Sequence, residues 1–114
     1  MTDLVEIALF TDDVAATTAF YRALVGTDPV SEWPGGAIFA VGCARILVHE
    51  RAAGIGDGPP NEDHVALGVV DVHAACGALR AGGHAVVVEP RAYAWGRSAY
   101  LRDPDGRLVE LTVG

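Results

Sequence analysis

Four polar side chains lie in stretches of the sequence that are otherwise apolar and alternate in the manner of β-strands. They are Glu6, His49, His64 and Glu110. Two imidazoles and two carboxylates suit a divalent transition metal, and the carboxylates would offset the charge of an ion placed in a cavity. Any one of the four could instead be a solvated residue at a strand end, and Glu110 could pair with a nearby arginine. A metal site is therefore a hypothesis that depends on how the four are arranged together.

An internal repeat gives the four residues corresponding places. Residues 5–25 resemble residues 63–83 when the chain is advanced by 58 positions, and Glu6 then falls on His64. Towards the end of each half, a shift of 61 positions lays Phe39 on Tyr100 and His49 on Glu110. Each half thus offers two of the four polar side chains, from its first and its last strand. If the two halves pair their open faces, the four would converge.

The elements that position these residues follow from apolar periodicity and from capping signals. In each half the pattern predicts a strand, a helix that begins after an aspartate and ends at glycine, and three further strands. The predicted strands are residues 4–10, 30–33, 37–41, 45–50, 64–70, 85–89, 97–102 and 107–112, and the helices follow Asp12 or Asp13 and Asp71. The sequence therefore predicts an α+β fold in which two βαβββ modules build an antiparallel-rich sheet with helices on one side.

The modules are expected to form a single domain of residues 1–114. Module 1 covers about residues 1–52 and module 2 about residues 63–114, and a linker rich in glycine and proline covers about residues 53–62. The glycines of residues 54–58 lack the full spacing of a nucleotide-binding loop, and no helical pattern follows them. A flexible connector between the modules is the better interpretation.

Composition excludes several classes of partner. The net charge is −7, there is no lysine, and the arginines are scattered, which argues against nucleic acid and against anionic membranes as partners. Cys43 and Cys76 form no C-x-x-C pair, as expected in a reducing compartment. No apolar stretch approaches the roughly 20 residues that span a bilayer, and no signal peptide is visible at the acidic start. We expect a soluble cytoplasmic protein.

Several of these segments also resemble a known family, the vicinal oxygen chelate superfamily of glyoxalase I, bleomycin-resistance proteins, fosfomycin-resistance thiol transferases and extradiol dioxygenases. The resemblance covers nearly the whole chain and is most specific in the last predicted hairpin. It rests on Val5–Leu9, Ala19–Tyr21, Asp63–Ala66 and Tyr100–Leu111. It implies two βαβββ modules in a cupped, incompletely closed barrel-like sheet with two flanking helices, and commonly a homodimer.

In metal-dependent members of that family, the ligands lie on the first and last strand of each module. His64 and Glu110 match this pattern directly. In the first module the opening position is usually His or Gln but here is Glu6, and the closing position is usually Glu or Gln but here is His49. The set resembles that of a glyoxalase with the first pair exchanged, which leaves the roles of Glu6 and His49 in doubt.

The leading hypothesis is a glyoxalase-like lyase or isomerase that depends on a divalent metal (Zn, Ni, Mn, Fe or Co) and acts on a small substrate with vicinal oxygens. The metal would act as a Lewis acid, and Glu110 or Glu6 would move the proton as general base. Three residues near the end of the chain could orient the polar end of the substrate. They are Arg97, Ser98 and Tyr100.

A binding protein that holds no metal and sequesters a drug, as in bleomycin-type resistance, is the opposing hypothesis. The acidic chain would suit a cationic ligand, and aromatic side chains could stack on its flat rings, although each could equally be ordinary packing. The candidates for stacking are Trp33, Phe39, Tyr93 and Trp95. An extradiol dioxygenase is less favoured because such enzymes are usually longer. A fosfomycin-type thiol transferase is less favoured because the chain has no lysine for the substrate phosphonate.

Overall fold

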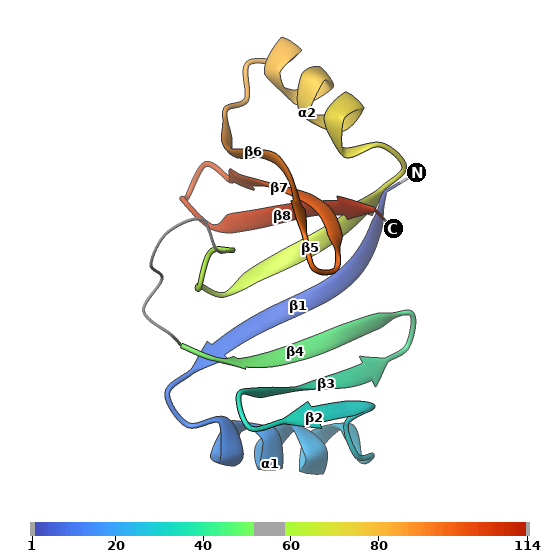
Figure 1. Ribbon diagram of the computed structural model, residues 1–114, viewed down its shortest axis with the longest axis vertical. Helices are drawn as coiled ribbons and strands as arrows, with labels where there is room; N and C mark the ends of the chain where they lie inside the picture. Colours follow the sequence, from blue (N-terminus) through green and yellow to red (C-terminus); the bar gives the residue numbers. More distant parts are fainter. Residues whose placement is uncertain (1, 52–58, 114) are drawn as a thin grey trace. The chain divides into compact units, whose positions relative to one another are not determined.

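The computed structural model describes residues 2–51 and 59–113 (Figure 1). The chain divides into two compact units, one of residues 6–63 and the other of the first five residues with the chain from His64 onward. Each unit carries one helix with strands before and after it, and the described residues form eight strands and two helices. The predicted α+β class and the order of two βαβββ modules are confirmed.

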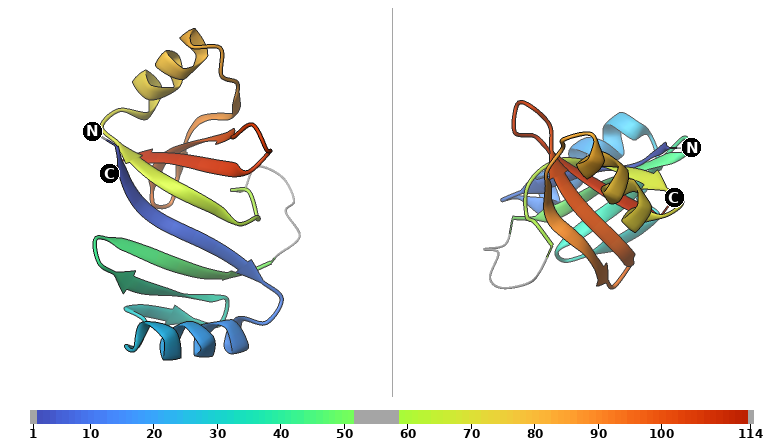
Figure 2. Two further views of the ribbon diagram at one scale, coloured as in Figure 1. Left: turned by 180° about the vertical axis from the view of Figure 1, so that it is seen from behind. Right: turned by 90° about the horizontal axis from the view of Figure 1, so that it is seen from above.

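In the first unit, α1 lies against β3 and β4 of a mixed four-stranded sheet (Figures 1 and 2). The strand order is β2-β3-β4-β1, in which β1 runs parallel to β4 and the other pairs are antiparallel. The elements are β1 (Asp3–Thr11), α1 (Val14–Val25), β2 (Ser31–Trp33), β3 (Gly36–Val41) and β4 (Ala44–Glu50). Strand β2 is the outer strand of this sheet.

The second unit repeats the arrangement. Its strand order is β5-β8-β7-β6, with β5 parallel to β8 and the other pairs antiparallel, and α2 packs on β6, β7 and β8. The elements are β5 (His64–Val69), α2 (Val72–Ala81), β6 (Val86–Tyr93), β7 (Gly96–Arg102) and β8 (Leu108–Val113). The predicted linker lies partly outside the described residues, and residues 59–63 hold no helix or strand.

Both helices begin with the same local chemistry. The carboxylate of Asp13 accepts a hydrogen bond from the backbone N–H of Ala16, and that of Asp71 accepts one from the N–H of Ala74. Each aspartate thereby satisfies a donor that the first helical turn leaves unpaired. Helix α1 ends at Gly26, whose φ of 85° lies in the left-handed region that favours glycine. Neither helix of the described chain is long and apolar enough to cross a membrane.

Strand β6 is longer than the sequence pattern predicts. The pattern ends at residue 89 because Pro90 lacks the N–H that a sheet interior needs. In the structure the strand continues to Tyr93, with irregular register against β7 between Val86 and Arg91. Because β6 is the outer strand of its sheet, a proline can lie there without losing an inter-strand hydrogen bond.

Each unit has its own hydrophobic core between its helix and its sheet. In the second unit, buried residues of α2, β7 and β8 pack together: Val72, Cys76, Ala99, Leu101 and Leu111. In the first unit, Phe39 and its buried neighbours Ala37 and Val48 pack against Tyr21 and Val25 of α1. Phe39 was a candidate for stacking on a ligand, but its ring is fully buried beneath the helix. The structure corrects that expectation, since strand alternation turns Phe39 towards α1.

We expect Gly77→Ala to raise the free energy of unfolding by about 0.5–1 kcal/mol, because glycine inside a helix costs that much relative to alanine. Gly77 lies in the middle of α2, is exposed, and has no atom within 4 Å of where a Cβ would be. Urea denaturation of the two proteins measures the difference. An unchanged or lower midpoint would show that this glycine has a structural role that its open surroundings do not suggest.

Candidate functional site

A buried pair of ionisable side chains occupies the second unit. His64 begins β5, and Glu110 lies on the neighbouring parallel strand β8, opposite Ala66. His64 Nε2 lies 3.0 Å from Glu110 Oε1. The two side chains are only 5% and 7% exposed, respectively. A buried carboxylate is costly unless it is paired and hydrogen-bonded, so the contact with His64 offsets part of the cost of burying Glu110.

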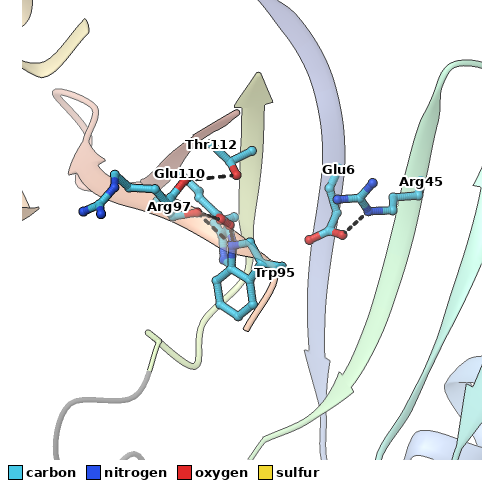
Figure 3. A network of polar contacts seen from close by, with 8 residues as sticks. Glu6, Arg45, Trp95, Arg97, Glu110 and Thr112 are labelled. Atoms are coloured by element: carbon cyan, nitrogen blue, oxygen red, sulfur yellow. Dashed lines mark hydrogen bonds and ion pairs between the residues drawn. The ribbon is translucent and has the colours of Figure 1, made fainter. Parts of the chain in front are cut away.

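The second oxygen of the Glu110 carboxylate is also occupied. The Ser98 hydroxyl donates a hydrogen bond of 2.7 Å to Glu110 Oε2, and the Trp95 indole N–H donates one of 2.8 Å to Ser98 Oγ (Figure 3). Ser98 lies on β7, which pairs with β8, and it is completely buried. Trp95 lies in the turn between β6 and β7 and is half exposed. Four side chains thus form one connected polar network.

Aromatic rings surround this network. The Tyr100 ring meets the His64 imidazole edge to face, with centroids 5.8 Å apart, and Tyr100 is 1% exposed. The Tyr93 ring is stacked on Trp95 at 4.7 Å with an interplanar angle of 10°. The Tyr93 hydroxyl is buried and has no hydrogen-bond partner among the described residues. The Tyr100 ring thus lies against the His64 end of the network and the Tyr93 ring against its Trp95 end.

In the first unit, the position that corresponds to His64 has a different partner. Glu6 lies opposite Arg45 on the parallel strand β4, and the Arg45 Nε donates to Glu6 Oε2 at 2.6 Å (Figure 3). The Glu6 side chain is 13% exposed and that of Arg45 is 45% exposed. Sequence reasoning missed Arg45, because the parallel pairing of β1 with β4 that places it opposite Glu6 joins residues 39 positions apart. The carboxylate of Glu6 is therefore engaged by a cation within its own sheet.

His49 lies on β4 as well, further along the strand than Arg45. It pairs with Phe10, whose ring centroid is 5.4 Å from that of the imidazole, and its Nδ1 lies 2.8 Å from the carbonyl oxygen of Glu50. Because Glu6 pairs with Arg45, four residues before His49, the two are separated by roughly 13 Å along the strands at about 3.3 Å per residue. Glu6 and His49 do not face each other as His64 and Glu110 do.

Strand register corrects the alignment that made His49 the counterpart of Glu110. Glu6 pairs with Arg45 on β4, and its counterpart His64 pairs with Leu108 on β8. Arg45 therefore corresponds to Leu108, and residues of β4 and β8 correspond at a shift of 63 positions rather than 61. At that shift the counterpart of Glu110 is Leu47, which carries no metal-binding atom. The error arose because both strands contain a Leu-Val pair, Leu47-Val48 in β4 and Leu108-Val109 in β8. Matching these pairs gives a shift that is two positions smaller than the shift that the strand register shows.

The remaining candidates are distributed over both units. Ser98 and Tyr100 are buried in the network around Glu110, whereas Arg97 is exposed and its guanidinium points away from that carboxylate (Figure 3). Trp95 is exposed and connected to the network through Ser98. Trp33 belongs to the first unit, is about one third exposed, and lies against Gly36. The structure thus brings Trp95, Ser98, Tyr100, His64 and Glu110 together in one unit.

His64 and Glu110 could supply two of the four ligands expected for a metal site. His64 and Glu110 present an imidazole nitrogen and a carboxylate oxygen to each other at 3.0 Å, and such groups bind zinc and similar ions. The corresponding pair of the first unit is Glu6 and Leu47, and Glu6 is bound to Arg45. Across residues 2–51 and 59–113, no group of three or more His, Cys, Asp or Glu side chains is placed to hold a metal ion.

We expect His49→Ala to leave the affinity for a divalent metal at the level of the unsubstituted protein, because the register removes His49 from the position that corresponds to Glu110. Isothermal titration calorimetry with zinc compares the affinities of the two proteins. A loss of affinity by about tenfold or more, as is typical when a ligand or its hydrogen-bond partner is removed, would restore His49 to the set of ligands.

Comparison with known proteins agrees with the fold. The family model described as "Glyoxalase/Bleomycin resistance protein/Dioxygenase superfamily" matches residues 3–111. Among solved structures, a methylmalonyl-CoA epimerase in complex with methylmalonyl-CoA and NH4+ is 26% identical with a TM-score of 0.74, and covers 100% of this chain and 96% of that chain. The epimerase of Streptomyces coelicolor is 25% identical with a TM-score of 0.73, over the same shares.

Curated relatives match over a shorter stretch. A probable lactoylglutathione lyase of Vibrio cholerae is 40% identical over 50 residues, which is 42% of this chain and 36% of that protein. Its namesake from Synechocystis is 42% identical over 50 residues, which is 42% of this chain and 38% of that protein. The matched stretch therefore spans little more than a third of the length of these relatives.

Proposed function

Because the chain belongs to the Glyoxalase/Bleomycin resistance protein/Dioxygenase superfamily, we propose that it is a divalent-metal-dependent lyase or isomerase acting on a small substrate with vicinal oxygens. The observation that carries this proposal is the buried pair of His64 and Glu110 on the parallel strands β5 and β8. These two residues would hold the metal. When bound, a divalent metal supplies a Lewis acid that polarises a substrate oxygen.

The protein's own contribution is a positioned acid–base group. Ser98 donates a hydrogen bond to Glu110 Oε2, and we assign to Oε1, which lies beside His64 Nε2, the role of accepting and returning a proton. A carboxylate in this role must stay within hydrogen-bond reach of the proton that it moves. Burial keeps competing water away from Glu110, and hydrogen bonds at both oxygens keep the carboxylate in one orientation.

The relatives support a reaction of this class. The curated relatives are named as lyases and the structural neighbours as epimerases, and an epimerase inverts one centre of its substrate. Removing a proton next to a carbonyl group and returning it is a route that serves both reactions. A positioned carboxylate such as Glu110 is the group that such a route needs from the protein.

A metal-free binding protein is the second candidate, and the first unit favours it. Glu6 is paired with Arg45, and Leu47 stands where a second carboxylate would be needed. The guanidinium of Arg45 beside Glu6 would disfavour a divalent metal ion at that carboxylate. In this function the acidic chain, with a net charge of −7, would attract a cationic drug, and the exposed face of Trp95 would contact its flat rings.

Elemental analysis after native purification separates the two functions. A metal-dependent enzyme is expected to carry close to one transition metal per chain, or to take one up on supplementation, and to unfold at a higher temperature with metal than after chelation. Absence of a stoichiometric metal after supplementation with zinc, nickel, manganese, iron and cobalt in turn would rule out the enzyme proposal. The proposed homodimer is tested on the same sample by light scattering coupled to size exclusion.

A further inference from the structure

We propose that Trp95 and Ser98 are positioning residues for Glu110, linked to it by hydrogen bonds that can point in only one direction. Trp95 donates to Ser98 at 2.8 Å, and Ser98 donates to Glu110 at 2.7 Å. The functional consequence, control of how Glu110 holds a metal, rests on the function proposed above. The hydrogen-bonded relay itself can be tested without any metal.

The direction of the relay follows from the inventory of donors and acceptors. An indole nitrogen can only donate, and an ionised carboxylate can only accept. Ser98 must therefore accept from Trp95 and give its single hydroxyl proton to Glu110. A serine without the tryptophan could rotate its hydroxyl towards other acceptors. The indole N–H thus removes the rotational freedom of the group that fixes Glu110 Oε2.

Hydrogen bonds in such a chain strengthen one another, because each donor is polarised by the bond that it accepts. Ser98 is completely buried and Glu110 is 5% exposed, so little water competes with either bond. The bond to the carboxylate is charge-assisted and is the stronger of the two. Removing the indole N–H is therefore expected to weaken the hold of Ser98 on Glu110 even though Trp95 does not touch Glu110.

Exposure makes Trp95 the accessible end of the relay. Its side chain is 51% exposed, and the ring stacked behind it, that of Tyr93, fixes the plane of the indole. A ligand that contacts the exposed part of the indole would therefore contact the same group that donates to Ser98. Trp95 is thus both a contact surface and a determinant of the orientation of Glu110.

Indole resonances of the metal-free protein test the relay. The chain has two tryptophans, so a ¹⁵N–¹H spectrum holds two indole signals, and Trp95→Phe assigns them by deletion. Ser98→Ala removes the acceptor of the Trp95 indole, and Glu110→Gln removes the charge at the far end. Both are expected to move the Trp95 signal by clearly more than the Trp33 signal, which serves as the internal reference in the same sample.

A second arm measures zinc affinity by calorimetry. Trp95→Phe keeps an aromatic ring on Tyr93 but loses the N–H. It is expected to weaken zinc binding by up to about tenfold, the lower end of the loss seen when a direct hydrogen-bond partner of a metal ligand is removed, because Trp95 acts on Glu110 through Ser98. Val87→Ala, which trims an exposed apolar side chain of β6 in the same unit, is the matched control and should bind zinc unchanged.

Two results would overturn the relay. One is a Trp95 indole signal that moves no more than that of Trp33 in both Ser98→Ala and Glu110→Gln. The other is a folded Trp95→Phe protein that binds zinc as tightly as the unsubstituted chain. If the unsubstituted chain binds none of zinc, nickel, manganese, iron and cobalt, the metal-dependent function fails, and the indole spectra still decide whether the relay exists.

Discussion

Glu110→Gln is expected to lower the affinity for a divalent metal by roughly 100-fold, at the upper end of the losses caused by disturbing the partners of a metal ligand. The substitution removes the negative charge while keeping nearly the same volume. The amide oxygen can still accept from Ser98, so the hydrogen bond that now reaches Glu110 Oε2 is preserved. A neutral amide oxygen is a much weaker ligand than a carboxylate, because it contributes no charge to offset that of the ion.

Competition between the protein and a chromogenic zinc chelator measures this loss. Glu110→Ala is a poorer test, because it also removes the carboxylate to which Ser98 and His64 are hydrogen-bonded, at a cost of about 1–3 kcal/mol for each buried group left unsatisfied. His64→Ala should match Glu110→Gln in metal affinity if the two act as a pair. Unchanged zinc binding in a folded Glu110→Gln protein would mean that the metal, if any, is held elsewhere.

Gly36→Ala is expected to destabilise the protein by about 3 kcal/mol, the upper range for overpacking a well-filled site. Gly36 begins β3, where a Cβ would lie 2.4 Å from the carbonyl oxygen of Val48 and 2.7 Å from Cζ2 of Trp33. The Trp33 ring could swing away, but the Val48 carbonyl belongs to β4, which is paired on both sides. The two central strands would have to separate locally to admit a methyl group.

Gly35→Ala is the matched control, because it places the same methyl group one residue earlier. There the nearest atom is Glu50 Oε1 at 3.2 Å, the end of a flexible side chain that can move aside. Thermal unfolding should show a drop of the midpoint by several degrees or more for Gly36→Ala and little change for Gly35→Ala. Equal midpoints for the two variants would contradict a rigid contact between Gly36 and β4.

The internal repeat predicted the architecture well, because the architecture depends on local signals that can be read from a single sequence. Strand alternation, the aspartates that cap each helix and the glycine that ends α1 are local signals, and the structure uses them as expected. Pairing partners are not local. Nothing near Glu6 in the sequence indicates that Arg45 will lie opposite it, since 39 residues separate them.

The sequence predicted that His64 and Glu110 lie together, but it misplaced His49 relative to them. His64 and Glu110 belong to strands with a clear alternation of apolar residues. The structure places His64 Nε2 3.0 Å from Glu110 Oε1. His49 was assigned from an alignment that rested on a Leu-Val pair, and register moved it by two positions. A shift of two keeps a residue on the same face of a strand, so the alternation pattern gave no warning of the error.

The two cysteines, one in each unit, differ sharply in chemical accessibility. Cys43 is exposed in the turn between β3 and β4, whereas Cys76 lies on the buried side of α2, in the core of its unit, where burial raises the pKa of its thiol. A buried, protonated thiol reacts slowly with alkylating reagents, because the thiolate is the nucleophile. Native protein would therefore take up one label at once, and the rate at which it takes up the second would time the opening of the unit that carries Glu110.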